Sequence, residues 1–222
     1  MGETVTVTAE DGHTFSAYVA YPEGVRRGSL IVVQEIFGVN RHIRSVVDRF
    51  AQDGYVTIAP AMFDRFERDV DMGYTADTVA HGRALKAKIT TEMAMTDLAA
   101  AFDIVEPHGD VGVVGYCWGG FVAWLAAVYL PGITCAVPYY GGGILEHQDL
   151  VPRSPVMAHF GDLDPILPIG TVREFIAKHP AHQMFIYAAD HGFNCDDRFT
   201  YNQAAADLAR ERTLAFFRQH VG

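Results

Sequence analysis

The segment GYCWGG at residues 115–120 places a reactive thiol between glycines. An apolar run at residues 111–114 precedes it and an apolar stretch at residues 121–129 follows it, so the pattern predicts a strand, a sharp turn and a helix. Glycines two positions before and after the cysteine let the backbone turn without a Cβ clash. The N-terminus of a helix favours the thiolate form, and Cys117 is therefore the candidate nucleophile.

Two later residues could complete a site for nucleophilic catalysis. His191 follows the last predicted strand and precedes the closing helix, where a general base would face Cys117. Asp164, in the segment GDLDP at residues 161–165, could hold the imidazole in the required tautomer. Asp162 competes for this role, and aspartate is also common in turns. The chain order of nucleophile, acid and histidine is the order of α/β-hydrolases.

A carboxylate stands at the end of an early apolar strand. Glu35 has apolar neighbours and should be buried, so it could accept the thiol proton, hold the resting cysteine, or form a structural pair. The backbone N–H groups of Ile36 and Trp118 are the predicted oxyanion donors, because one comes from an early loop and the other follows the nucleophile.

Substrate contacts are predicted from charged and aromatic side chains. Arg198, Arg65 and Arg68 could each clamp a substrate carboxylate, although Arg65 and Arg68 could equally be surface charges paired with aspartates. Tyr140, Phe37 and Phe193 could line an apolar pocket, as could Tyr139 and Trp118.

Composition excludes several classes of protein. The formal net charge of −10 argues against nucleic acid and against an anionic membrane as partners. The longest apolar run has about ten residues, whereas a membrane-spanning helix needs roughly 20. The start of the chain lacks the pattern of a secretory signal. Three cysteines without framework spacing predict free thiols in a reducing cytoplasm.

Sequence motifs indicate neither a metal nor a cofactor. The chain has no H-x-x-x-H or H-E-x-x-H pattern, and its cysteines are too scattered for zinc. No G-x-G-x-x-G follows the first parallel strand, and no P-loop is present. The expected partner is a small molecule, and the chain is expected to be a monomer or a small homo-oligomer.

The remaining pattern predicts one α/β domain over residues 1–222. Residues 4–8 and 14–21 form a predicted hairpin around Asp11-Gly12. Alternating strands and helices then give a mostly parallel central sheet with helices on both faces, and the site gathers at the carboxyl ends of the strands. Residues 62–82 are read as a loop or short helix over that site. Strands are predicted at residues 29–33, 55–59, 111–115, 135–139, 156–160 and 183–187, and helices at 41–53, 90–105, 121–129, 172–178 and 204–218.

With these residues assembled, the chain resembles the dienelactone hydrolase family (carboxymethylenebutenolidases) of the α/β-hydrolase superfamily. The combination of QEIFG and GYC-x-GG is specific, and the resemblance covers nearly the whole chain. The matching segments are QEIFG at 34–38, GYCWGG at 115–120, YYG at 139–141, GDLD at 161–164 with Pro168, and HGF at 191–193.

The resemblance implies a triad of Cys117, His191 and Asp164, with Glu35 deprotonating or gating the thiol. It further implies attack of the thiolate on a lactone carbonyl and an acyl-enzyme, whose hydrolysis the released enolate would assist. The product would be of the maleylacetate type, and maleylacetate is an intermediate of chloroaromatic degradation. Family members bind the substrate carboxylate with two arginines. One would be among Arg65, Arg68 and Arg83. The other lies a few residues after the histidine, where this chain has Asn-Cys-Asp-Asp before Arg198.

Three other functions remain open at this point. The chain could be a general carboxylesterase for small esters, or a non-catalytic protein that binds a ligand on the same fold. It could also be a thiol redox sensor that uses Cys117, with Cys195 as its resolving cysteine.

Overall fold

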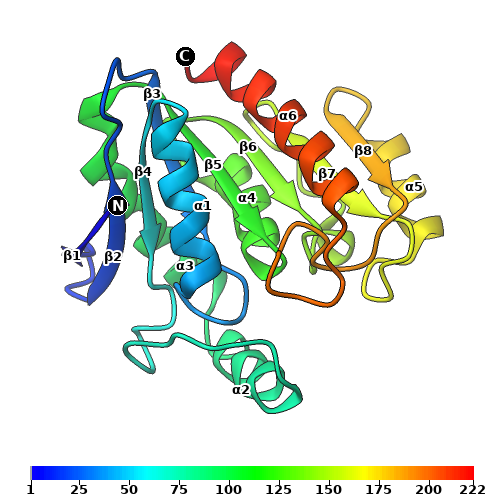
Figure 1. Cartoon of the computed structure of the whole chain (residues 1–222), viewed down its shortest axis with the longest axis horizontal. Coiled ribbons are helices and arrows are strands. Elements are labelled where there is room, and N and C mark those ends of the chain that lie inside the picture. Colours follow the sequence, from blue (N-terminus) through cyan, green and yellow to red (C-terminus); the bar gives the residue numbers. More distant parts are fainter. Residues whose placement is uncertain (1) are drawn as a thin grey trace.

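Eight strands lie side by side in one sheet, in the order β1-β2-β4-β3-β5-β6-β7-β8 (Figure 1). The computed structural model describes residues 2–222. β1 pairs antiparallel with β2, β2 pairs antiparallel with β4, and the other neighbouring strands run parallel. The strands are β1 (Glu3–Thr8), β2 (Thr14–Ala20), β3 (Gly28–Val33), β4 (Tyr55–Pro60), β5 (Val111–Tyr116), β6 (Ile133–Tyr139), β7 (Met157–Gly161) and β8 (Gln183–Tyr187).

The first two strands form the predicted hairpin. Thr8 lies opposite Thr14, and the Asp11 side chain accepts a hydrogen bond from the backbone N–H of His13 at 3.1 Å. Side chains on these strands alternate between exposed and buried, as expected where one face of a sheet meets water.

The central strands are buried over their whole length. Every residue of β3, β4 and β5 is buried, which follows from apolar runs covered by helices on both faces. From β3 the chain passes to β4 on one side, and β5 then pairs with β3 on the other side. The strand order therefore reverses at β3, and in such sheets a ligand crevice lies at the carboxyl ends beside this point.

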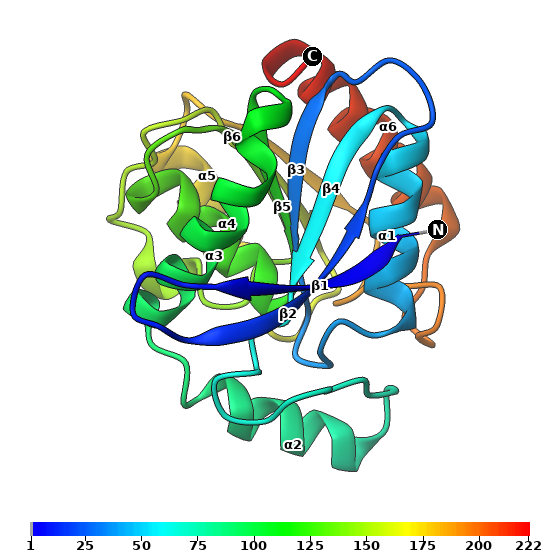
Figure 2. The ribbon, with the colours of Figure 1, turned by 90° about the vertical axis from the view of Figure 1, so that its left-hand side faces the viewer.

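Helices cover both faces of the sheet. In Figure 2, α1 and α6 lie on one side, and α3, α4 and α5 lie on the other. The expected α/β-hydrolase arrangement is therefore confirmed. The α-helices are α1 (Arg41–Gln52), α2 (Ala76–Lys86), α3 (Thr91–Val105), α4 (Trp118–Tyr129), α5 (Ile169–Lys178) and α6 (Gln203–His220), and two 3-10 turns are η1 (Glu106–His108) and η2 (Leu145–His147).

One segment differs from its predicted form. α2 begins after Thr75, whose side chain and that of Thr78 form a capping box, and the helix continues four residues beyond the predicted end at Gly82. Figures 1 and 2 show α2 outside the layers of the sheet, beyond the carboxyl ends of the central strands. It therefore lies on the side of the molecule where β3 and β5 end.

Within residues 2–222, each helix lacks either the length or the apolar composition that crossing a bilayer requires.

Candidate active site

The turn after β5 holds Cys117 in a strained conformation. Its backbone has φ 54° and ψ −118°, a region that non-glycine residues rarely occupy. A Cβ on Gly115 would lie 1.9 Å from the carbonyl oxygen of Gly119, so the turn closes only with glycine there. The backbone N–H of Cys117 donates to the carbonyl of Tyr139 at 3.0 Å. The strain is thus held by β6, and the thiol stands at the N-terminus of α4.

Three side chains from separate loops form a hydrogen-bonded chain. His191 Nε2 lies 3.1 Å from Cys117 Sγ, and His191 Nδ1 lies 2.7 Å from Asp164 Oδ2. The other carboxylate oxygen of Asp164 accepts backbone N–H groups of Ile166 at 2.8 Å and Leu167 at 3.3 Å. Of the two candidate aspartates, Asp164 is buried and contacts the imidazole, whereas Asp162 is exposed.

Neighbouring negative charge controls the protonation of His191. Burial alone would lower the pKa of this imidazole, but the charge of the Cys117 thiolate and the Asp164 carboxylate outweigh burial and raise the pKa of His191 to about 10. The contact therefore couples the protonation of His191 to the charge on Cys117.

Glu35 pairs with Arg198 beneath the same crevice. Arg198 Nη1 donates to Glu35 Oε1 at 3.3 Å, and the Glu35 side chain is 1% exposed. Glu35 Oε2 is buried without a hydrogen-bond partner among residues 2–222. Burial lowers the pKa of Arg198, but the charge of Glu35 outweighs it and the pKa is raised. In this structure Glu35 therefore contacts the arginine rather than the thiol.

The loop after β8 carries both the imidazole and Arg198. A Cβ on Gly192 would lie 2.5 Å from Arg198 Nη1, and Gly192 has φ +79°. Glycine next to His191 therefore lets the guanidinium pass back toward Glu35. The guanidinium also lies over the rings of Phe37 and Tyr74, 5.9 Å and 5.7 Å from their centroids.

The two predicted oxyanion donors both border the crevice. Ile36 and Trp118 line the cavity above Cys117, and neither backbone N–H has a hydrogen-bond acceptor within residues 2–222. The helix α2 packs directly on the first of these loops, because a Cβ on Gly82 would lie 1.9 Å from the carbonyl oxygen of Ile36. A shift of α2 would therefore displace the Ile36 peptide.

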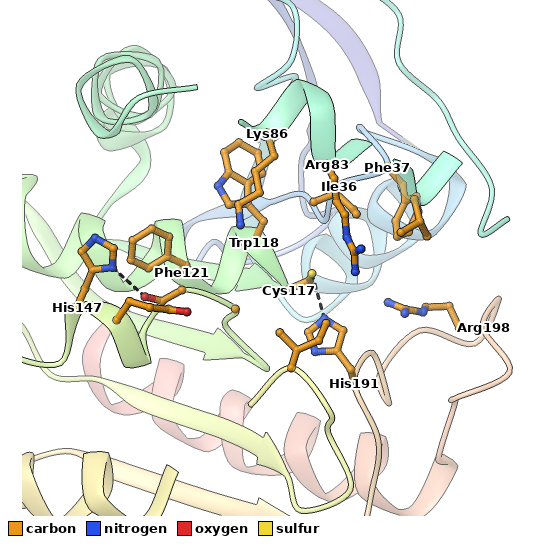
Figure 3. Close-up of a pocket in the computed structure, with 15 residues that line it drawn as sticks. Ile36, Phe37, Arg83, Lys86, Cys117, Trp118, Phe121, His147, His191 and Arg198 are labelled. Atoms are coloured by element: carbon orange, nitrogen blue, oxygen red, sulfur yellow. Dashed lines mark hydrogen bonds between the residues drawn. The ribbon is translucent and has the colours of Figure 1, made fainter. Parts of the chain in front are cut away.

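These groups surround one cavity of about 420 Å³ (Figure 3). Arg83 and Lys86 of α2 project into it, and neither side chain forms an ion pair within the described part of the chain. Both therefore have charge free for a ligand. The lining residues are Ile36, Phe37, Val79, Arg83, Lys86, Cys117, Trp118, Phe121, Gly142, Gly143, Glu146, His147, Ile166, His191 and Arg198.

Two arginines predicted to bind substrate lie elsewhere. Arg65 donates two hydrogen bonds to the buried carboxylate of Asp97, at 2.9 Å and 2.7 Å, and a third to Asp11 at 2.7 Å. Arg68 donates to the backbone carbonyl of Thr14 at 2.8 Å. Both side chains thus contact the turn end of the β1–β2 hairpin, and Arg65 joins it to α3, so neither arginine lies at the predicted substrate position.

The predicted aromatic residues separate into two groups. Phe37 and Trp118 line the cavity, whereas Tyr140 and Phe193 are fully buried behind it. The ring of Tyr140 lies edge-on to that of His191, with centroids 5.1 Å apart, and Phe193 packs against Tyr140 at 5.3 Å. Both rings therefore support the imidazole from behind and lie outside the cavity lining.

Sequence reasoning passed over Lys86, and it named Arg83 only as one of three alternatives. Val79, Arg83 and Lys86 are spaced as i, i+4 and i+7, which places them on one face of a helix. The capping pair Thr75 and Thr78 was the signal that a helix begins at this point.

One group of potential metal ligands occurs in residues 2–222. The ligand atoms of His42, Cys195 and Asp196 lie within 4.8 Å of one another. His42 Nδ1 already contacts Asp196 Oδ1 at 3.3 Å, and burial raises the pKa of the Cys195 thiol to about 12. As arranged, these side chains dock the loop after β8 onto the first turn of α1.

Comparisons with known proteins agree with this geometry. The sequence profile of the dienelactone hydrolase family matches residues 15–221. A carboxymethylenebutenolidase of Pseudomonas putida is 32% identical over 96% of this chain and 95% of its own. A protein of Synechocystis sp. assigned as a carboxymethylenebutenolidase is 34% identical over 93% of this chain and 92% of its own.

A solved structure from Klebsiella pneumoniae, assigned as a dienelactone hydrolase, superposes with a TM-score of 0.83 at 28% identity and covers 98% of this chain and 100% of that one. The chain belongs to the dienelactone hydrolase family and is a hydrolase acting on lactone or ester bonds.

Proposed function

We propose that this protein opens a small carboxylate-bearing lactone or ester, of the dienelactone type, through a covalent acyl-enzyme on Cys117. The contact of 3.1 Å between Cys117 Sγ and His191 Nε2 carries the proposal, because it places a nucleophile and its proton partner on a crevice lined by unpaired backbone N–H groups. The buried Asp164 on the other ring nitrogen completes the arrangement.

Acylation begins from the thiolate–imidazolium pair. The thiolate of Cys117 attacks the carbonyl carbon, the C–S bond forms, and the carbonyl electrons move to the oxygen. The N–H groups of Ile36 and Trp118 stabilise this oxyanion. When the intermediate collapses, the C–O bond breaks and His191 gives its Nε2 proton to the departing oxygen.

In deacylation, His191 accepts a proton instead of giving one. Neutral His191 takes a proton from water, the hydroxide adds to the thioester carbonyl, and the C–S bond breaks. The thiolate returns beside a protonated His191, and the carboxylic acid leaves as its anion after giving its proton to solvent. With a dienelactone, the departing oxygen can instead remain on the acyl-enzyme as an enolate beside protonated His191, and it then takes the proton from the attacking water in place of neutral His191.

Substrate charge would be met by Arg198 and Arg83. Arg198 is shared between Glu35 and the cavity, so a substrate carboxylate at its guanidinium competes with Glu35. Loss of that partner would leave Glu35 buried with its charge unbalanced, and a buried unpaired carboxylate is a stronger base. We propose that Glu35 gates the nucleophile in this way, because an anionic substrate at Arg198 releases the Glu35 carboxylate from its partner only when that substrate has bound.

The free thiols of Cys117, Cys135 and Cys195 support a reducing cytoplasmic setting, which we propose together with this activity. Aromatic-compound degradation is the corresponding proposed role.

The test is ultraviolet loss of dienelactone beside hydrolysis of a neutral p-nitrophenyl ester, with the wild type and Cys117→Ala. Dienelactone loss that disappears in the variant supports the nucleophile and the substrate together. Activity on the neutral ester alone, still dependent on Cys117, would keep the mechanism but replace the substrate by other small esters. Activity that survives in Cys117→Ala would refute the acyl-enzyme.

A further inference from the structure

The cavity extends from Cys117 in two directions (Figure 3). On one side lie Arg83, Arg198 and Phe37, which we name the cationic end. On the other side lie Phe121 and His147, which we name the aromatic end. A cavity of about 420 Å³ is within the range of roughly 300–1,000 Å³ that holds drug-sized ligands. A five-membered lactone placed at Cys117 with its carboxylate at the cationic end leaves the aromatic end unfilled.

The aromatic end is a built surface. The ring centroids of Phe121 and His147 lie 4.7 Å apart, and the two planes are tilted by 39°. His147 Nδ1–H donates to the carbonyl of Gly143 at 2.9 Å, which fixes the orientation of the imidazole. A Cβ on Gly143 would lie 3.0 Å from the Phe121 ring, so the backbone packs directly against that ring. Both rings are therefore held in place before a ligand arrives.

Charge separates the two ends. Glu146 precedes His147 in the turn η2 and also lines the cavity, and it forms no ion pair within residues 2–222. Lys86 lies on the same side of Cys117 as Phe121 and carries the opposite charge, so this side favours neither a cation nor an anion, whereas Arg83 and Arg198 attract an anion at the cationic end. The group that fits the aromatic end is thus neutral and planar.

We propose that the aromatic end binds the leaving group of an elongated substrate, a monoester of a short dicarboxylic acid with a ring-bearing alcohol. The free carboxylate lies at Arg83 and Arg198, the scissile carbonyl lies over Cys117, and the ring packs against Phe121 and His147. This inference rests on the proposed function, because Cys117 must attack between the two ends. Water then releases the dicarboxylate, and the alcohol departs with the proton from His191.

Monobenzyl and monoethyl succinate test the aromatic end directly. Their leaving alcohols have similar acidity, so a difference in kcat/KM reports binding of the ring rather than leaving-group chemistry. The wild type should prefer the benzyl ester by at least about tenfold, the discrimination that an apolar pocket gives to added hydrocarbon.

Two variants locate this preference. Phe121→Ala and the exposed His147→Ala should each reduce the ratio to within about threefold of unity, chiefly through a lower kcat/KM for the benzyl ester. Phe199→Ala is the matched control, because this aromatic side chain is 96% exposed and lies outside the cavity lining. It should keep the wild-type ratio.

The outcomes separate the two proposals. Cys117-dependent hydrolysis of both esters at equal kcat/KM in the wild type would overturn the inference and leave the proposed function standing. A benzyl preference that persists in both Phe121→Ala and His147→Ala would also overturn it. If neither succinate nor dienelactone is hydrolysed, the proposed function fails and this inference fails with it.

Discussion

Replacing Cys117 by serine should reverse the pH dependence of acylation. In the wild type the pKa of His191 is raised from 6.5 to about 10, which corresponds to about 5 kcal/mol of extra stabilisation of the imidazolium. Burial opposes this stabilisation, while the Cys117 thiolate and Asp164 supply it. A serine hydroxyl is neutral, so the variant loses the thiolate share and keeps the 2.7 Å contact with Asp164.

The direction of each profile follows from the proton that each nucleophile needs. The wild type attacks as a thiolate beside a protonated His191, so kcat/KM should fall as pH rises through about 10. The Cys117→Ser variant needs neutral His191 as a base, so its residual kcat/KM should rise with pH through a lower pKa. At neutral pH we expect at least about 100-fold loss of activity, because the base is held in its protonated form.

Two measurements check this reasoning. Nitrogen-15 NMR of the histidine side chains gives the pKa of His191 in both proteins, and the serine variant should titrate at least about one unit lower, equivalent to about 1.4 kcal/mol. Hydrolysis of monoethyl succinate, whose leaving alcohol must take a proton, gives the kcat/KM profiles when it is measured from pH 5 to 11. A His191 pKa that stays near 10 in Cys117→Ser, or turnover like that of the wild type, would refute the thiolate–imidazolium pair.

Further predictions concern α2, the arginines and a buried histidine. Gly82→Ala puts a Cβ 1.9 Å from the Ile36 carbonyl oxygen, so it should displace an oxyanion donor and lower kcat at least about tenfold. Gly73→Ala is the control, because its Cβ would meet no atom within 4 Å, and it should leave steady-state rates unchanged. Arg83→Met should raise KM about tenfold for carboxylate substrates and leave Tm unchanged. Arg65→Met should lower the free energy of unfolding by about 3 kcal/mol, because it leaves Asp97 buried and unpaired. The opposite pattern would restore Arg65 as a substrate ligand. Burial lowers the pKa of His159 to about 3, so the unfolded state binds the extra proton below about pH 6.5 and the wild type should lose stability progressively from there toward pH 3. Denaturant titrations of His159→Gln should lack this acid-dependent loss, and an equal slope in both proteins would exclude His159 as its source.

The sequence predicted those parts of the site whose chemistry is local. Glycines around Cys117 and the order of nucleophile, acid and histidine are visible along the chain, and each of these residues follows a strand of a parallel sheet. Parallel strands end at one edge, so the topology brings the three loops together without further information. The fold itself was predictable for the same reason, because apolar runs alternate with helical spacing throughout.

The substrate side was not predictable, because it depends on which face each arginine presents. Arg65, Arg68 and Arg83 carry the same charge in neighbouring segments, and only their surroundings in the fold separate them. Arg65 pairs with Asp97, which is 1% exposed, Arg68 donates to Thr14, and Arg83 lines the cavity. Gly82 was read as the end of an irregular segment, whereas its missing side chain lets α2 approach Ile36 and turn Arg83 into the cavity. Tyr140 and Phe193 were equally ambiguous, since an aromatic residue near a site can support the histidine instead of the ligand.

The loop after β8 links recognition to catalysis. His191 and Arg198 belong to this one loop, and Gly192 lets the guanidinium return beneath the imidazole to meet Glu35. Asp196 and Asp197 fasten the same loop to His42 and Arg41 at the N-terminus of α1, where the helix dipole favours carboxylates. Glu35 follows β3 and Cys117 follows β5, and α1 packs against β3. The loop that carries Arg198 and His191 is therefore held in a fixed position relative to Glu35 and Cys117. A substrate carboxylate that takes Arg198 from Glu35 therefore acts within a frame that keeps His191 at Cys117.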